Sequence, residues 1–290
     1  MAGVGFVGLG QMGGAMALHL AGCDGGLTVC DIRAEATEPH VAAGATAVVS
    51  PAELARRSDV ISIMVLDDSQ VRDVIAEMLP AAAPGTTFAI HSTIRPETAV
   101  QLAAEAGAAG MSVVDAPVSG GFMGAADGTL AVLVGGDEAA VDRCRPSFEC
   151  WAKLILHFGP VGSGTRAKLA RNLMHFVSFT AALEAQRLAE AAGVDLGSLA
   201  KVVRHTDAIT GGPGAILVRD TTAPIPEGDF WHPIMTHTRT LGEKDLTLAL
   251  ALGDDLGVDL PLGRLALEQF AANLGVPHDR DTADPERDGL

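Results

Sequence analysis

Short apolar runs alternate with amphipathic stretches along the first half of the chain. The runs are continuously apolar, as expected for strands of a parallel sheet that is covered on both faces. We expect strands over residues 4–7, 27–31, 45–49, 59–65, 87–91, 112–115 and 130–134. Helices are expected after residues 8–13 to about residue 21, from Ser50-Pro51 onward, and over 68–79 and 96–106. This alternation predicts a doubly wound α/β domain.

The pattern changes near residue 162, where the strand-like runs stop. One long helix is expected over residues 163–192, followed by helical segments over 196–205, 214–218, 238–252 and 263–274. We therefore predict an α/β domain over 1–161 and an all-α domain over 162–276, joined by the long helix. The acidic segment 277–290 is expected to be a disordered tail.

Charge and composition remove several classes of partner. Lys and Arg total 20 against 36 Asp and Glu, a net charge of −16, which argues against nucleic acid and anionic membranes. No apolar run approaches the roughly 18 residues of a membrane span. The N-terminus enters an apolar run without a basic segment before it, so no signal peptide is expected. The four cysteines form no CxxC pair, which favours reduced thiols and a cytoplasmic location.

A glycine motif follows the first predicted strand. Gly8, Gly10 and Gly13 have the spacing of a dinucleotide-binding turn that opens a helix, and Asp31 ends the next strand. Gly8 permits the tight turn, Gly10 lets the backbone approach a pyrophosphate, and Gly13 allows close helix packing. Asp31 can accept hydrogen bonds from the ribose hydroxyls, which favours NAD. Arg33 can pair with a 2′-phosphate, so NADP stays open. The motif predicts a Rossmann-type domain.

Four ordered segments make the chain resemble a known family. The segments are FVGLGQMG at residues 6–13, DAPVSGG at 115–121, the GSG at 162–164 with Lys168 and Asn172, and Lys244-Asp245 with Leu248-Ala249. In these residues the chain resembles the β-hydroxyacid dehydrogenases, a group that includes 3-hydroxyisobutyrate dehydrogenase and the more distant 6-phosphogluconate dehydrogenase.

The resemblance implies a catalytic and a substrate-binding segment. It implies that Lys168 exchanges the hydroxyl proton, that Asn172 orients the substrate, and that Ser119, Gly120 and Gly121 hold the substrate's carboxylate. The residues themselves fit these roles. Lys168 and Asn172 are four apart and so share one helix face. A lysine exchanges protons near neutral pH only if its pKa falls well below ~10.4. The chain has no tyrosine that could act in its place.

The remaining candidate residues concern the cofactor. The resemblance implies that the turns after the strands contact it, that a threonine lies near the nicotinamide ribose, and that a lysine reaches it from the helical domain. Leu66 stands where relatives usually carry a proline. No cluster of His, Cys and carboxylates has metal-site spacing, so no metal is expected. The candidate cofactor residues are Gly8, Leu9, Gly10, Gln11, Met12, Gly13, Asp31, Arg33, Val65, Leu66, Thr93 and Lys244.

We therefore expect an NAD-dependent oxidoreductase, with NADP as the other candidate cofactor, that acts on a small anionic β-hydroxy acid or the matching semialdehyde. The alternatives are an NADPH-dependent reductase of glyoxylate, succinic semialdehyde or tartronate semialdehyde, and a non-catalytic NAD(P)-binding protein. Lys168 argues against an imine reductase, a class that usually replaces this lysine. A homodimer or homotetramer built through the helical domain is expected. His232 and His237 are interpreted as structural or exposed rather than as part of the pocket.

Overall fold

The computed structural model describes residues 3–22 and 25–278, which fall into two compact units, Met1–Asn172 and Leu173–Leu290. The first unit contains a six-stranded sheet in the order β3-β2-β1-β4-β5-β6, and every neighbouring pair is parallel. This is the strand order of a dinucleotide-binding domain. The strands are β1 (Val4–Val7), β2 (Leu27–Cys30), β3 (Thr46–Ala47), β4 (Val60–Ile63), β5 (Thr87–Ile90) and β6 (Ser112–Asp115).

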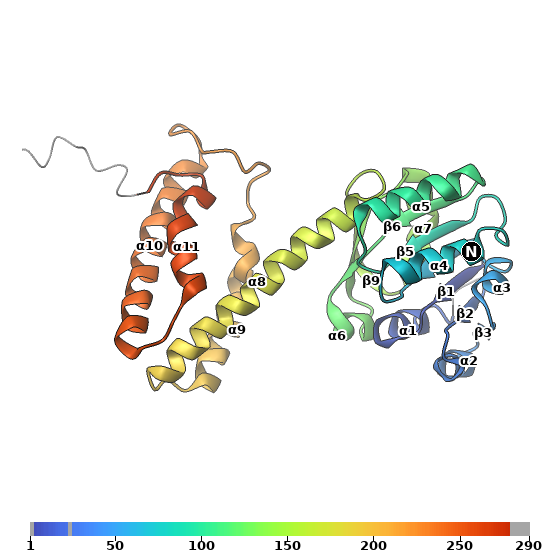
Figure 1. The fold of residues 1–290 in the computed structure, drawn as a ribbon, viewed down its shortest axis with the longest axis horizontal. Helices are drawn as coiled ribbons and strands as arrows, with labels where there is room; N and C mark the ends of the chain where they lie inside the picture. Colours follow the sequence, from blue (N-terminus) through green and yellow to red (C-terminus); the bar gives the residue numbers. More distant parts are fainter. Residues whose placement is uncertain (1–2, 23–24, 279–290) are drawn as a thin grey trace, which may run out of the picture. The chain divides into compact units, whose positions relative to one another are not determined.

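Helices cover both faces of this sheet (Figure 1). Successive strand residues point to opposite faces, so Phe6 belongs to one buried cluster and Val7 to the other. One cluster includes side chains of α1, α6 and α7, and the other includes side chains of α3, α4 and α5. The helices and turns are α1 (Gln11–Leu18), η1 (Ala34–Thr37), α2 (Glu38–Ala42), α3 (Pro51–Ala55), α4 (Asp68–Met78), α5 (Pro96–Ala108), α6 (Gly121–Ala126) and α7 (Glu138–Phe148).

A smaller sheet follows the main one. It consists of β7 (Val118–Ser119), β8 (Leu130–Val134) and β9 (Ala152–His157), with an antiparallel β7–β8 pair and a parallel β8–β9 pair. An isolated bridge between Asp115 and Gly135 links the end of β6 to the residue after β8. The expected strand over 130–134 is confirmed, whereas β7, β9, α6 and α7 were not predicted.

The second unit is helical throughout its described part. Its division from the first falls inside α8 (Ser163–Ala191), the long helix that the sequence predicts. The others are α9 (Leu196–Thr210), the 3₁₀ turn η2 (Gly212–Ile216), α10 (Trp231–Leu256) and α11 (Pro261–Leu274). The predicted fold class, a Rossmann-type α/β domain and an all-α domain with a long helix at their junction, is confirmed.

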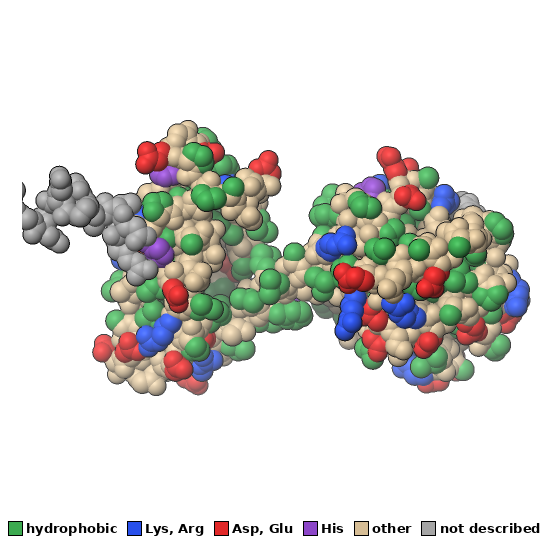
Figure 2. All heavy atoms as spheres, turned by 45° about the horizontal axis from the view of Figure 1, so that its top comes forward, with side chains coloured by type: hydrophobic (Ala, Val, Ile, Leu, Met, Phe, Trp, Pro, Cys, Tyr) green, Lys and Arg blue, Asp and Glu red, His purple; other side chains and the backbone are tan. Residues whose placement is uncertain are grey.

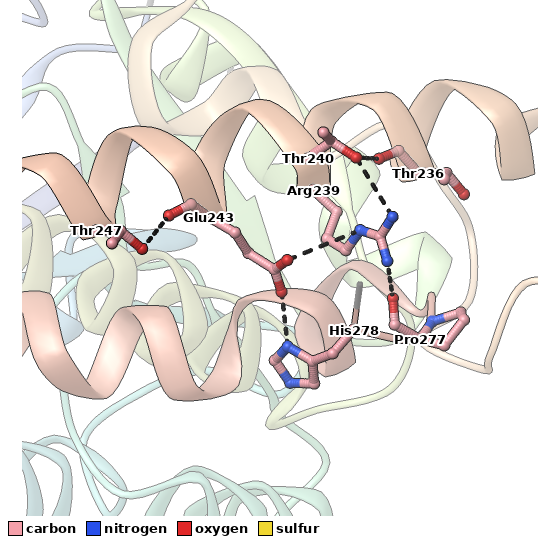
Figure 3. A network of polar contacts seen from close by, with 7 residues as sticks. All are labelled: Thr236, Arg239, Thr240, Glu243, Thr247, Pro277 and His278. Carbon is pink, nitrogen blue, oxygen red and sulfur yellow. Dashed lines mark hydrogen bonds and ion pairs between the residues drawn. The ribbon is translucent and has the colours of Figure 1, made fainter. Parts of the chain in front are cut away.

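A polar network fixes the chain segment that follows α11 to α10 (Figure 3). The buried Arg239 guanidinium donates to the carbonyl of Pro277 at 2.7 Å and lies 4.0 Å from the Glu243 carboxylate. Glu243 Oε1 lies 2.6 Å from His278 Nδ1. The first two residues of the predicted tail, Pro277 and His278, are thus held, and the rest of that tail lies outside the described residues.

Apolar side chains also lie on the surface of the helical unit (Figure 2). Those exposed along α8 include Leu173, Phe176, Val177, Phe179 and Leu183. Among the residues that the structure describes, no helix combines the length and the apolar character needed to cross a membrane.

Candidate active site

The glycine turn lies at the carboxyl end of β1, where its three glycines meet different surroundings. Gly8 has a φ of 91°, which side chains rarely adopt, and a Cβ there would clash with the Met64 carbonyl at the end of β4. A Cβ at Gly13 would clash with the Gly8 carbonyl. A Cβ at Gly10 would meet nothing within 4 Å. Gly8 and Gly13 are therefore required by the fold, whereas Gly10 leaves open space beside the N-terminus of α1.

This arrangement fits an anionic nucleotide. Gly10 is the N-cap residue of α1, and no side chain caps that helix end. The first backbone N–H groups of a helix have no partner within the helix, and its N-terminus favours negative charge. The open space at Gly10 thus lets a pyrophosphate approach N–H groups that suit it.

Asp31 lies at the end of β2 and fixes the glycine turn. Its carboxylate accepts hydrogen bonds from the backbone N–H of Leu9 at 2.6 Å and of Arg33 at 2.8 Å. The Arg33 side chain is 56% exposed, and its Nε lies 3.5 Å from the same carboxylate. A carboxylate has about four acceptor positions, so the ribose hydroxyls can still bind it. Sequence reasoning missed this contact with Leu9.

The turns after β4 and β5 are joined by Ser92. The buried Ser92 hydroxyl donates to the Val65 carbonyl at 2.7 Å and accepts from the Val65 N–H at 2.9 Å. Val65 also lies beside Gly8, since a Cβ on that glycine would come within 3.1 Å of its side chain. The candidates Leu66 and Thr93 are exposed beside this joint. The sequence did not predict this contact between Ser92 and Val65.

The predicted carboxylate-binding segment has an unusual backbone. Ser119 ends β7, and Gly120 and Gly121 follow with φ angles of 136° and 64°. Both glycines are exposed, and Ser119 is half-buried. Positive φ at two successive residues favours glycine over any other residue. The segment therefore presents backbone that side chains do not cover.

Lys168 and Asn172 lie near the start of α8. Lys168 is only 9% exposed, and among the described residues its ammonium makes no hydrogen bond or ion pair. Burial, with a smaller contribution from the Arg171 charge, lowers the pKa of Lys168 to about 8. Asn172 is half-buried one turn further on, and its Oδ1 accepts from Arg171 at 3.3 Å. A buried amine without a partner, and with a pKa near neutrality, is suited to proton exchange.

Asp115, the last residue of β6, holds the start of α8. It is fully buried, and its carboxylate accepts from the N–H groups of Gly162 and Thr165, both at 2.6 Å. Burial raises the pKa of Asp115, and these backbone hydrogen bonds offset part of that effect. Sequence reasoning placed Asp115 in a substrate-binding segment but did not predict this role.

The structure joins some of the predicted site residues by direct contacts. Hydrogen bonds and close packing connect the glycine turn with Asp31, Arg33 and Val65. Lys244 belongs to the helical unit, where it pairs with Asp245 at 3.0 Å and lines a cavity of about 430 Å³, so its contact with the cofactor stays a prediction. His232 is half-buried and His237 exposed in the first turns of α10.

The described residues include a further cavity. A cavity of about 550 Å³ in the helical unit is lined by Glu243, Thr247, Leu250, Arg264, Leu267, Glu268 and His278. No candidate site residue lines it. Within residues 3–22 and 25–278, no three His, Cys, Asp or Glu side chains gather in a way that could hold a metal.

The fold and the glycine turn define a dinucleotide-binding architecture. Residues 3–159 match the family model described as the NAD binding domain of 6-phosphogluconate dehydrogenase. Residues 162–285 match the model described as the NAD-binding domain of NADP-dependent 3-hydroxyisobutyrate dehydrogenase. The chain belongs to the β-hydroxyacid dehydrogenase family, as its motifs predicted.

Individual relatives agree with this assignment. An uncharacterized oxidoreductase of Mycobacterium tuberculosis is 55% identical over 95% of this chain and 94% of its own. A solved structure from Mycobacterium avium, described no further than as an oxidoreductase, is 53% identical with a TM-score of 0.92, over 96% of this chain and 100% of that one. The structure of Mycobacterium tuberculosis 3-hydroxyisobutyrate dehydrogenase with L-serine is 34% identical with a TM-score of 0.67, over 96% of each chain.

These matches confirm two predictions. The family consists of hydroxyacid dehydrogenases that bind NAD or NADP, so the predicted cofactor class and the general reaction class are confirmed. The individual site residues, the choice between NAD and NADP, and the substrate stay predictions.

Proposed function

We propose that this protein transfers a hydride between NAD and a small β-hydroxy acid, interconverting the hydroxy acid and its semialdehyde. The observation that carries this proposal is the buried, unpartnered Lys168, whose pKa is lowered to about 8 beside Asn172 on α8. A solvated structural lysine has neither property. The relative with bound L-serine supports the substrate class, because serine is itself a β-hydroxy acid.

In this proposal each side chain has one task. When the cofactor is bound, its nicotinamide ring accepts the hydride from the hydroxyl carbon, or donates it in reverse. During oxidation the neutral Lys168 amine takes the hydroxyl proton as the carbon–oxygen double bond forms. During reduction the Lys168 ammonium returns that proton. Ser119, Gly120 and Gly121 bind the substrate's carboxylate through a hydroxyl and exposed backbone, and the Asn172 amide orients the substrate.

The residues at the carboxyl edge of the sheet would hold the cofactor. The N–H groups from Gly10 to Gly13 face the pyrophosphate, and Asp31 accepts from the ribose hydroxyls. Asp31 is the basis for NAD over NADP, since its charge repels a 2′-phosphate. We propose Val65, Leu66 and Thr93 as further contacts and Lys244 as the contact from the helical unit.

The test is an activity screen with matched variants. About a dozen β-hydroxy acids and semialdehydes, including 3-hydroxyisobutyrate, L-serine, glyoxylate and the succinic and tartronate semialdehydes, are assayed with NAD and NADP. Lys168→Met should lower kcat by about 10²- to 10⁴-fold, with the Kd for cofactor unchanged. Lys153→Met, an exposed lysine of β9, is the control and should keep full activity.

The pH dependence gives a second readout of the same experiment. Oxidation needs the neutral amine, so its rate should rise with pH and level off above about 8, the pKa of Lys168. Reduction needs the ammonium and should decline above that pH. Activity that is unchanged in Lys168→Met contradicts the mechanism. A clear preference for NADPH contradicts the role of Asp31, and a wild-type protein that binds cofactor but turns over no substrate favours the non-catalytic alternative.

We also propose a homo-oligomer assembled through the helical unit and a cytoplasmic location. The apolar side chains exposed on α8 support the first, and the absence of paired cysteine motifs supports the second.

A further inference from the structure

The start of α8 is capped from outside the helix. Asp115 ends β6, 47 residues before Gly162 in the sequence, and it is fully buried. One carboxylate oxygen accepts from the Gly162 N–H and the other from the Thr165 N–H. Both N–H groups lie at the N-terminus of α8, where backbone N–H groups have no hydrogen-bond acceptor within the helix. Both arms of the carboxylate are therefore used to hold the first turn of α8.

Three backbone segments meet at this cap without intervening side chains. Asp115 and Gly135 exchange backbone hydrogen bonds of 3.0 and 2.8 Å. A Cβ at Gly164 would lie 2.7 Å from the Asp115 carbonyl and 2.8 Å from the Gly135 nitrogen, so only glycine fits there. A Cβ at Gly135 would press on the Asp115 carboxylate and the Gly164 nitrogen. The joint thus sets the position of the helix backbone with little freedom.

Lys168 lies on the helix whose first turn this joint holds. It lies three residues after Thr165, on the neighbouring turn of the same helix. Among the described residues its ammonium has no hydrogen-bonding or ionic partner, so no polar contact of its own fixes its position, and the backbone of α8 sets where the side chain begins. We propose that Asp115 is the positioning residue that holds Lys168 in its buried place, through the joint with Gly135 and Gly164. This rests on the proposed function, in which Lys168 exchanges the substrate's proton.

The joint requires a carboxylate at position 115 and not merely a capping group. An asparagine at position 115 has nearly the same shape, but only one of its two arms accepts hydrogen bonds. Its NH₂ group would face a backbone N–H at the distance of a hydrogen bond, and one buried N–H would lose its acceptor. By contrast, Asp195 caps α9 through a single oxygen, which accepts from the Ser198 N–H at 2.8 Å, and asparagine can replace it there.

The test measures Lys168 directly in the full-length protein. Competitive labelling of amines with acetic anhydride across a pH series, read by mass spectrometry, gives the titration midpoint of Lys168 with or without a known substrate. The wild type should show a midpoint near pH 8. In Asp115→Asn, water reaches the lysine and the midpoint should rise by about one unit or more toward the ordinary value. Asp195→Asn should leave it unchanged.

Activity is measured in parallel. Asp115→Asn should lower kcat about tenfold or more, because a small displacement of a reacting group is costly, while the Kd for NAD stays within about threefold. If Asp115→Asn does not fold, Gly135→Ala tests the same joint, since its methyl group displaces the carboxylate.

The outcomes separate this inference from the proposed function. A folded Asp115→Asn or Gly135→Ala variant with the wild-type midpoint overturns the inference, as does an equal shift in Asp195→Asn. A shifted midpoint in a protein that turns over no substrate supports the positioning role and contradicts the proposed function.

Discussion

The two units of the chain are built on very different amounts of buried apolar surface. In Met1–Asn172, two extensive clusters pack on opposite faces of the parallel sheet. In the described part of Leu173–Leu290, one cluster contains only Ile225, Met235, Leu274 and Val276. The helices of that unit also leave many large apolar side chains exposed. The first unit is therefore stabilised by its own apolar interior. The second has a small apolar core, is also held by a polar network, and leaves apolar surface exposed.

Substitution of Gly13 should break the first unit. Gly13→Ala places a methyl group against the Gly8 carbonyl, and neither backbone can move away without distorting the turn. We expect the free energy of unfolding to fall by roughly 4 kcal/mol. A Trp231→Phe background leaves Trp151, buried in the first unit, as the fluorescent reporter for denaturant unfolding.

Gly10→Ala is the matched control for that substitution. Its methyl group enters open space, so stability should change by less than about 0.5 kcal/mol. Cofactor affinity should nevertheless fall, because the methyl group occupies the space proposed for the pyrophosphate. Equal destabilisation by both substitutions would contradict the distinction between the glycines that the fold requires and the one that leaves room for a ligand.

The helical unit should respond most to Arg239. This side chain is 3% exposed and holds both the Pro277 carbonyl and the Glu243 carboxylate. Arg239→Met leaves a largely buried carboxylate and a carbonyl without their cation, which should destabilise the unit by about 3 kcal/mol. Hydrogen exchange of peptides from α10 and α11 should become faster, while exchange in β1 and β4 should not change.

The surface ion pair of Arg264 with Asp254 provides the comparison for Arg239. Its two side chains are 50% and 58% exposed. Arg264→Met should therefore cost at most about 1 kcal/mol. If Arg239→Met and Arg264→Met have equal free energies of unfolding, the buried network around Arg239 does not stabilise this unit more than a surface ion pair does.

A third test uses a polar group in the larger core. His91 is fully buried, with Nδ1 2.8 Å from the Ala116 carbonyl and Nε2 3.0 Å from the Ser62 hydroxyl. Burial lowers the pKa of His91 to about 4, from an ordinary value of 6.5. Between these values the unfolded chain binds the extra proton, so the free energy of unfolding should decrease as the pH falls, by about 3 kcal/mol in total.

Denaturant titrations from pH 7 to pH 4 measure this decrease. His91→Gln removes the titrating group, so its stability should depend less steeply on pH than that of the wild type, whatever its stability at pH 7. Parallel curves for the two proteins would show that His91 is not the source of the acid sensitivity.

The sequence predicted local features better than the contacts between distant segments. The strand over 112–115 and the helix start at Ser50 are confirmed, and the Ser50 hydroxyl accepts from the Glu53 N–H at 3.2 Å. The helix expected over 238–252 is longer, Trp231–Leu256. Pro233 lies in the first turn of α10, where a missing N–H costs little. α7, which contains Pro146, was not predicted.

At the candidate site, too, the sequence predicted local features better than contacts between distant segments. The spacing of Gly8, Gly10 and Gly13 predicted a turn whose geometry the structure shows, because that turn is local. The partners of Asp115 lie 47 and 50 residues away, and those of Ser92 lie 27 residues away, so no local pattern announces them. The burial of Lys168 likewise results from tertiary packing. Motif spacing predicted the candidate residues, and the fold shows what holds them.

The uncovered surface of the helical unit gives the last and smallest test. Phe179 on α8 is 51% exposed, and its ring centroid lies 4.3 Å from that of His175 and 6.0 Å from that of Phe176. If a second copy of the chain covers this aromatic group, Phe179→Glu should weaken association by about 2 kcal/mol, a loss of roughly 30-fold in affinity. Leu154→Glu, at a residue 50% exposed on β9 of the first unit, should leave association unchanged.

Sedimentation velocity over a concentration series measures the association of both variants. A monomeric wild type contradicts the oligomer, and a Phe179→Glu variant that associates like the wild type excludes this part of α8 from the interface. The apolar side chains of the helical unit would then have to be covered by a contact that does not involve Phe179.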